Sequence, residues 1–84
     1  MKYPMFSIKD DKTGFSCPTC DQSEASAVRN FSFAVNNSDT VMGFAPKDYD
    51  LYKVGEFDTD SGKIRTFVPE FVVSGSSVFG VNDK

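Results

Sequence analysis

The spacing of apolar residues changes along the chain, and one segment has the spacing of an amphipathic helix. In the segment 22–36 the apolar side chains recur at intervals that place them on one stripe of a helix. They are Ala27, Val28, Phe31, Ala34 and Val35. Asp21 is followed three residues later by Glu24, which is the spacing of a capping box. The run Asn36–Asp39 is typical of a helix end, because its side chains compete for backbone hydrogen bonds. We therefore predict one helix over about 22–36, capped by Asp21.

The segment before this helix predicts a hairpin. Residues 3–8 include an alternating Phe6 and Ile8 and predict a first strand. The charged segment 9–14 ends in a glycine, as connections between hairpin strands commonly do. Residues 15–19 predict a short second strand that Pro18 interrupts.

The longest strand pattern follows the helix and covers Tyr49–Asp58. Its alternation fails at Val54 and Gly55, which predicts a β-bulge at the glycine. The Asp- and Gly-containing segment 58–62 predicts a tight turn, and Lys63–Val68 predicts an antiparallel return strand. Pro69 cannot donate a ladder hydrogen bond, so it predicts either a break or an edge strand.

Three shorter apolar segments complete the pattern. Val41–Phe44 is too short for an independent helix, so we expect a loop or turn there. Phe71–Val73 and Val78–Val81, separated by Ser and Gly residues, predict a final hairpin. The whole pattern predicts an α+β fold in which a small antiparallel sheet of about four to six strands, built from hairpins, packs against a single helix. We expect a single domain over residues 1–84.

The size and charge of the chain limit the kinds of protein it can be. A chain of 84 residues buries only about 60–65% of its unfolded surface, so we expect self-association, most simply a two-fold dimer. The formal net charge is −3 and the sequence pI is about 4.7. This charge disfavours a strongly basic nucleic-acid binder, although it is compatible with a local basic face. The chain has no apolar run of ~20 residues and no signal-peptide core, so we expect a cytoplasmic protein with no membrane contact.

The residue types disfavour catalysis and metal binding. The sequence contains no His, which is the commonest general base and the commonest metal ligand. We therefore expect no catalytic site, no cofactor and no metal. The segment Asp58–Gly62 resembles the start of a calcium loop. However, positions 5, 6 and 12 of that loop would be Gly62, Lys63 and Pro69, so a hairpin turn is favoured.

Cys17 and Cys20 form a Cys-x-x-Cys motif just before the predicted helix. A motif of this kind at a helix N-terminus is the arrangement of glutaredoxins, in which the helix lowers the pKa of the first thiol. A single predicted helix disfavours that fold. A zinc site needs four ligands and would require two chains to share their cysteines. The third alternative, two free thiols in a reducing cytoplasm, is favoured.

Aromatic and basic residues occur together in the long predicted hairpin. They are Tyr49, Tyr52, Lys53, Lys63, Arg65 and Phe67. Aromatic side chains on an exposed sheet can stack unpaired bases while neighbouring cations contact phosphates. The hairpin is therefore a candidate site for single-stranded DNA, centred on Tyr52, Lys53, Lys63, Arg65 and Tyr49. The same residue types are also ordinary in a half-buried strand.

Four segments of the chain carry a resemblance to a known family. They are Met1–Ile8, Ala25–Phe31, Phe44–Ile64 and Pro69–Gly75. In this order they resemble the small nonstructural protein of gokushoviruses, which are single-stranded DNA phages of the Microviridae. The resemblance implies a nonenzymatic phage accessory protein of the host bacterial cytoplasm. It also implies a role in single-stranded genome synthesis or packaging, through binding of single-stranded DNA or control of the switch to single-strand production.

Two other classes of function stay open at this point. One is a protein-interaction module that binds a phage replication or assembly protein, or a host factor, through an apolar patch. The other is the glutaredoxin-like thiol–disulfide oxidoreductase. Salt dependence separates the two leading classes, because phosphate contacts weaken as the salt concentration rises and apolar docking does not.

Overall fold

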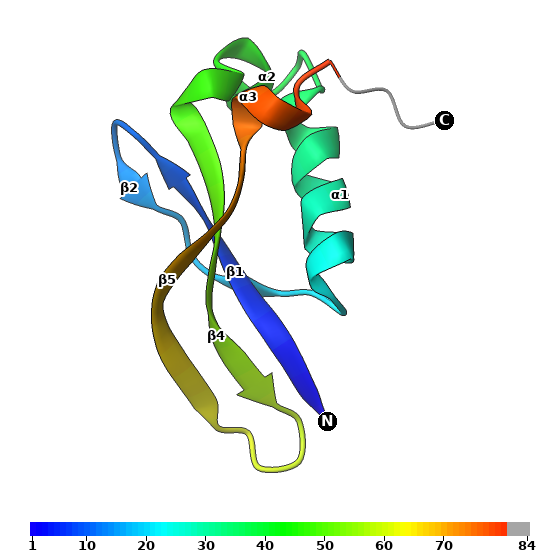
Figure 1. The fold of residues 1–84 in the computed structure, drawn as a ribbon, viewed down its shortest axis with the longest axis vertical. Helices are drawn as coiled ribbons and strands as arrows, with labels where there is room; N and C mark the ends of the chain where they lie inside the picture. The colour runs from blue at the N-terminus through cyan, green and yellow to red at the C-terminus, as the bar shows by residue number, and fades with distance from the viewer. Residues whose placement is uncertain (81–84) are drawn as a thin grey trace.

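A computed structural model describes residues 1–80 of the chain. Three long strands form the centre and one edge of an antiparallel sheet, and two short strands pair with the remaining edge of β1 (Figure 1). The strands are β1 (Lys2–Asp10), β2 (Gly14–Phe15), β3 (Thr19–Cys20), β4 (Tyr49–Asp58) and β5 (Ile64–Ser74). The order is β2-β1-β4-β5, with β3 also paired to β1. The helical elements are α1 (Glu24–Val35), α2 (Val41–Phe44), α3 (Gly75–Val78) and the 3-10 turn η1 (Pro46–Asp48).

The α+β fold predicted from the sequence is confirmed, and α1 is the longest of its helices. The core lies on the face of the sheet that packs against α1. Phe6 and Leu51 contribute to it from the sheet, and Ala27, Phe31 and Val35 from the helix. All three helix residues belong to the predicted apolar stripe. The β4–β5 turn and the start of β1 extend beyond the N-terminal end of α1 (Figure 1), so the helix covers only part of the sheet.

The predicted helix is confirmed, but its predicted cap is wrong. The N-cap is Ser23, whose backbone is extended and whose hydroxyl accepts a hydrogen bond from the Ser26 amide at 3.1 Å. Asp21 lies two residues upstream, outside the capping position. Its carboxylate instead accepts a hydrogen bond from the Asn30 side chain at 3.1 Å.

The central strand pair follows the sequence prediction closely. Strand β4 has the predicted bounds. Met5 pairs with Gly55 and Phe6 pairs with Lys53, so Val54 is the extra residue of the predicted bulge. A Cβ atom on Gly55 would collide with the Arg65 carbonyl oxygen, which explains why glycine stands at this position.

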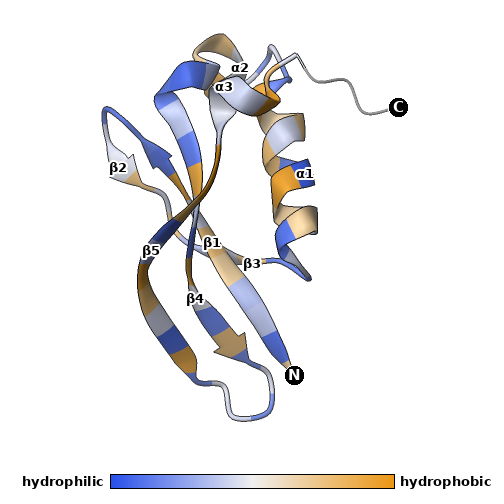
Figure 2. Ribbon diagram, viewed as in Figure 1, coloured by the Kyte–Doolittle hydropathy of each residue, from blue (hydrophilic) through white to orange (hydrophobic). Residues whose placement is uncertain are grey.

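Strand β5 is longer than predicted, because it continues through Pro69 to Ser74. Gly55 pairs with Thr66 and Lys53 with Glu70, so residues 67–69 stand opposite Val54 in a second irregularity. Pro69 is tolerated here because β5 is an edge strand and its ladder is already interrupted. Hydrophobic residues occur at several positions along β5, separated by hydrophilic ones (Figure 2).

The predictions for the short apolar segments are wrong. Val41–Phe44 is a one-turn helix, because the Thr40 hydroxyl caps it by accepting from the Gly43 amide at 3.0 Å. The predicted final hairpin does not form among the described residues. Phe71–Val73 belongs to β5, and Gly75–Val78 forms α3, whose N-cap Ser74 accepts from the Ser77 amide at 3.2 Å. Val81, the end of that predicted hairpin, lies outside the described residues.

Candidate nucleic-acid interface

Three aromatic rings form a row across the sheet. Tyr52 lies between Phe15 and Phe71, with ring centroids 5.2 Å from Phe15 and 5.8 Å from Phe71. Both pairs are edge-to-face, with interplanar angles of 77° and 82°, a favoured geometry for aromatic pairs. Leu51 is buried against α1, and successive side chains of a strand point to opposite faces. The row therefore lies on the sheet face away from α1.

The row of rings crosses β1 at Ser7, a small buried residue. Ser7 of β1 pairs with Tyr52 and is 3% exposed. Its hydroxyl donates to the Ser16 carbonyl at 2.7 Å, and Ser16 in turn accepts from the Ile8 amide through its hydroxyl at 3.0 Å. These bonds fix the segment that carries Phe15. A small side chain at position 7 leaves room for the rings of β2 and β4 to meet across β1.

The two outer rings of the row are accessible to solvent. Phe15 is 47% exposed and Phe71 is 58% exposed, whereas Tyr52 is partly buried between them. The Lys9 ammonium lies 5.7 Å from the centroid of the Phe15 ring. Asp50 pairs with Lys9 in the β1–β4 ladder, so a carboxylate partly offsets this positive charge. We call the surface formed by Lys9, Phe15, Tyr52 and Phe71 the aromatic face.

A second aromatic–cation cluster lies on the opposite face. The Lys53 ammonium is 5.5 Å from the centroid of the Phe67 ring, and the Arg65 guanidinium carbon is 5.1 Å from it. Arg65 also lies 3.9 Å from the Glu56 carboxylate, across the β4–β5 ladder. Lys53 directly follows Tyr52, so the alternation of the strand separates this cluster from the aromatic face.

The structure brings together two of the five residues expected to form the site. Lys53 and Arg65 meet at Phe67, while Tyr52 points to the other face. Tyr49 lies at the start of β4 and packs against the core. Burial, followed by the negative charge of Asp10, raises the pKa of Tyr49.

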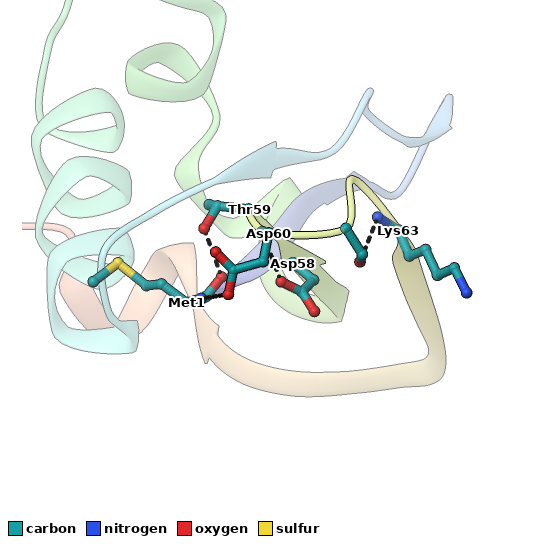
Figure 3. A network of polar contacts seen from close by, with 6 residues as sticks. Met1, Asp58, Thr59, Asp60 and Lys63 are labelled. Atoms are coloured by element: carbon teal, nitrogen blue, oxygen red, sulfur yellow. Dashed lines mark hydrogen bonds and ion pairs between the residues drawn. The ribbon is translucent and has the colours of Figure 1, made fainter.

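Lys63 lies in the turn before β5, where its backbone amide donates to the Ser61 hydroxyl at 3.2 Å (Figure 3). Hydrogen bonds within the segment Asp58–Gly62 form the predicted hairpin turn. The Asp58 carboxylate accepts from the Asp60 amide at 2.9 Å, a bond that lowers the pKa of Asp58. Asp60 pairs with the Met1 ammonium at 3.0 Å.

Within residues 1–80, no group of three or more acidic, Cys or His side chains is placed to hold a metal ion.

Phe15, Phe71 and Lys9 were not predicted as site residues. The sequence predicts that Pro69 breaks or limits the return strand, which places Phe71 in a separate strand. Phe15 lies far from Tyr52 in the sequence, and only the pairing of both β2 and β4 with β1 brings the two rings together. Strand alternation alone could have shown that Tyr52 and Lys53 face opposite sides.

The two cysteines do not have the arrangement of a glutaredoxin site. Both are free and exposed. Cys20 belongs to β3, where it pairs with Met5, and Cys17 precedes that strand. Since Ser23 caps α1, the Ser26 amide at the start of the helix binds a serine hydroxyl and not a thiol.

The fold and the site define a small α+β protein with a one-sided core and an exposed aromatic sheet face. Residues 3–78 match the family model described as Phage ORF5 protein, so the chain belongs to this family of phage proteins. No curated protein and no solved structure matches the chain. In the described part of the chain, no helix has the length and apolar character needed to cross a membrane.

Proposed function

We propose that this phage protein is a nonenzymatic accessory protein that binds single-stranded DNA through its aromatic face. It acts in synthesis or packaging of a single-stranded genome, in the cytoplasm of the host bacterium. We also propose that its lineage is that of the gokushoviruses, on the resemblance of the four segments described above. The row of Phe15, Tyr52 and Phe71 is the observation that carries the proposed activity.

Base stacking supplies most of the binding energy in this proposal. Stacking of one base on an aromatic side chain contributes about 1–3 kcal/mol and tolerates any base. Phe15 and Phe71 offer two accessible rings on either side of Tyr52. They therefore suit unpaired bases, whose faces are accessible in a single strand and hidden in a duplex.

Few cations are available for phosphate contacts, which agrees with the acidic sequence. Lys9 lies at the Phe15 end of the aromatic face, whereas Lys53 of β4 and Arg65 of the edge strand β5 lie on the opposite face, which a bound strand would reach by passing over β5. Single-strand binding loses about 0.7 of a logarithmic unit of affinity per tenfold increase in salt for each neutralised phosphate. Three contacts give a slope of about −2. We therefore expect a shallow salt dependence and a larger contribution from stacking.

Fluorescence anisotropy with a labelled oligo-dT tests this proposal. Phe71→Ala should weaken binding about tenfold and leave the salt slope unchanged, because stacking releases no counterions. Replacing Lys53 and Arg65 by Ala should instead flatten the slope by about 0.7 for each lost contact, so the double variant should keep about a third of the wild-type slope. Phe33→Ala is the matched control, since Phe33 is 74% exposed on α1, outside the aromatic face. Wild-type protein without affinity at low salt would refute the proposal.

A second candidate function is binding of a phage replication or assembly protein, or of a host factor. The observation that favours it is the outer edge of β5, with which no strand pairs among residues 1–80. Val68 on this edge is 86% exposed. An extended peptide could add to such an edge as a further strand. A partner bound in this way, with an affinity that does not fall as salt rises, would favour this function over DNA binding.

A further inference from the structure

Phe44 is an apolar side chain that neither the core nor the aromatic face uses. It stands at the end of α2 and is 88% exposed. Lys47, three residues later in η1, is also exposed. This part of the surface therefore presents a phenyl ring with a cation nearby. Exposure of one large apolar residue is ordinary, so the argument depends on the surface beside it.

A cavity of about 290 Å³ lies next to α2, between this helix and the β1–β2 hairpin. Its apolar walls include Ile8, Val41, Met42 and Tyr49, together with Phe15 of the aromatic face. A cavity of roughly 150 Å³ accommodates benzene, so this one is large enough for a phenyl ring. Val41 and Met42 belong to α2 itself, which means that one helix supplies both a wall of the cavity and the exposed Phe44.

The polar side of this cavity carries one carboxylate. Asp10 lines it and is held by the Lys12 amide at 3.0 Å and the Thr13 hydroxyl at 3.1 Å. Asp11 and Asp48 lie close by, since the Asp11 amide donates to the Asp48 carbonyl at 2.9 Å. The cavity therefore combines apolar walls with negative charge. Phe44 and Lys47 combine an apolar ring with positive charge, so the two surfaces are complementary in both respects.

We propose that two copies of this chain form a dimer in which each inserts Phe44 into the cavity beside α2 of the other. A two-fold axis close to α2 allows both insertions at once. In an interface with two-fold symmetry, every contact from the first copy to the second is repeated from the second to the first. Lys47 of each copy then lies near the carboxylates of the other. The outer edge of β5 is a poorer dimer interface, since Pro69 and the irregularity at residues 67–69 interrupt it.

Sedimentation velocity over micromolar to millimolar concentrations tests the dimer. We expect a reversible monomer–dimer equilibrium. Phe44→Ser should raise its Kd by about tenfold or more, because a buried aromatic is the typical hot spot of an interface. Lys47→Glu should raise the Kd by about two- to fivefold, as loss of an exposed ion pair does. Phe33→Ser is the control and should leave the Kd unchanged, since Phe33 is 74% exposed and does not line the cavity.

NMR on a mixture of isotope-labelled and unlabelled protein identifies the contact directly. Nuclear Overhauser effects between the Phe44 ring of one copy and the Met42 or Ile8 methyl groups of the other would support the proposal. A protein that stays monomeric at millimolar concentration would overturn it. A dimer that Phe44→Ser leaves intact, or one whose intermolecular contacts involve Val68 and Phe71, would overturn it as well. None of these outcomes depends on DNA binding.

Discussion

Gly75 offers a sharp test of how α3 is packed. This residue is buried where α3 begins, directly against the backbone of η1 and β4. A Cβ atom at position 75 would collide with the Pro46 carbonyl oxygen and would lie 2.8 Å from the Tyr49 carbonyl oxygen. Both obstacles are backbone atoms, which cannot move aside as a flexible side chain can. We therefore predict that Gly75→Ala destabilises the protein.

The size of the effect follows from two opposing contributions. Forcing an extra methyl group into a packed site costs about 1–3 kcal/mol. Replacing a glycine by alanine also restricts the unfolded chain, which stabilises the folded protein by about 0.4–1 kcal/mol. The steric cost is larger, so the free energy of unfolding should fall by roughly 1–2 kcal/mol. In a domain of this size, that corresponds to a decrease in Tm of about 4–16 °C.

Urea unfolding followed by circular dichroism measures this difference. The midpoint should move to lower urea concentration with an unchanged m-value, because the surface exposed on unfolding stays the same. Ser76→Ala, one residue further along α3 and exposed, is the matched control and should unfold like the wild type. If Gly75→Ala were as stable as Ser76→Ala, the close approach between α3 and η1 would not exist as described.

Two further predictions concern the β4–β5 turn and the thiols. The pKa of Asp58 is lowered in the folded protein by the hydrogen bond from the Asp60 amide, so its stabilising contribution is present above the unfolded pKa of about 3.9. This contribution should disappear as the pH falls through the lower folded pKa. Asp58→Asn should therefore lose less stability than the wild type between neutral and strongly acidic pH in parallel thermal melts. Replacing Cys17 and Cys20 together by Ser should leave the melting temperature and oligo-dT binding unchanged, since both thiols are exposed and free. Loss of bound zinc, or of oxidoreductase activity, in the double variant would contradict this expectation.

Local patterns were sufficient to predict the helix and the central strand. The stripe that includes Phe31 and Val35 specifies α1, because the spacing of buried residues in a helix is fixed by its geometry. The bulge in β4 was also predictable, since Gly55 interrupts the alternation. The cap was misplaced because Asp21 and Ser23 are both good capping residues, and only the backbone geometry distinguishes them.

Features that depend on contacts between distant segments were not predictable in this way. Strand β5 continues past Pro69 because pairing with β4 resumes at Glu70, which a local rule for proline does not anticipate. The residues that meet at the candidate site differ from the predicted ones for the same reason. The expected grouping of Tyr52 with Lys53 followed from their proximity in the chain, whereas sheet geometry separates neighbours and joins Tyr52 to Phe15 and Phe71.

The row of rings across β1 has a consequence for the order of events during synthesis and folding. Its members come from the first, middle and last parts of the chain, so the aromatic face forms only when β2, β4 and β5 have all joined the sheet. A nascent chain lacks this face until Phe71 has left the ribosome. In the folded protein, local opening of the edge strand β5 would remove one end of the face and would also withdraw Val72 and Val73 from the core. Hydrogen exchange of β5 amides would then report on the fraction of molecules in which the row of three rings is complete.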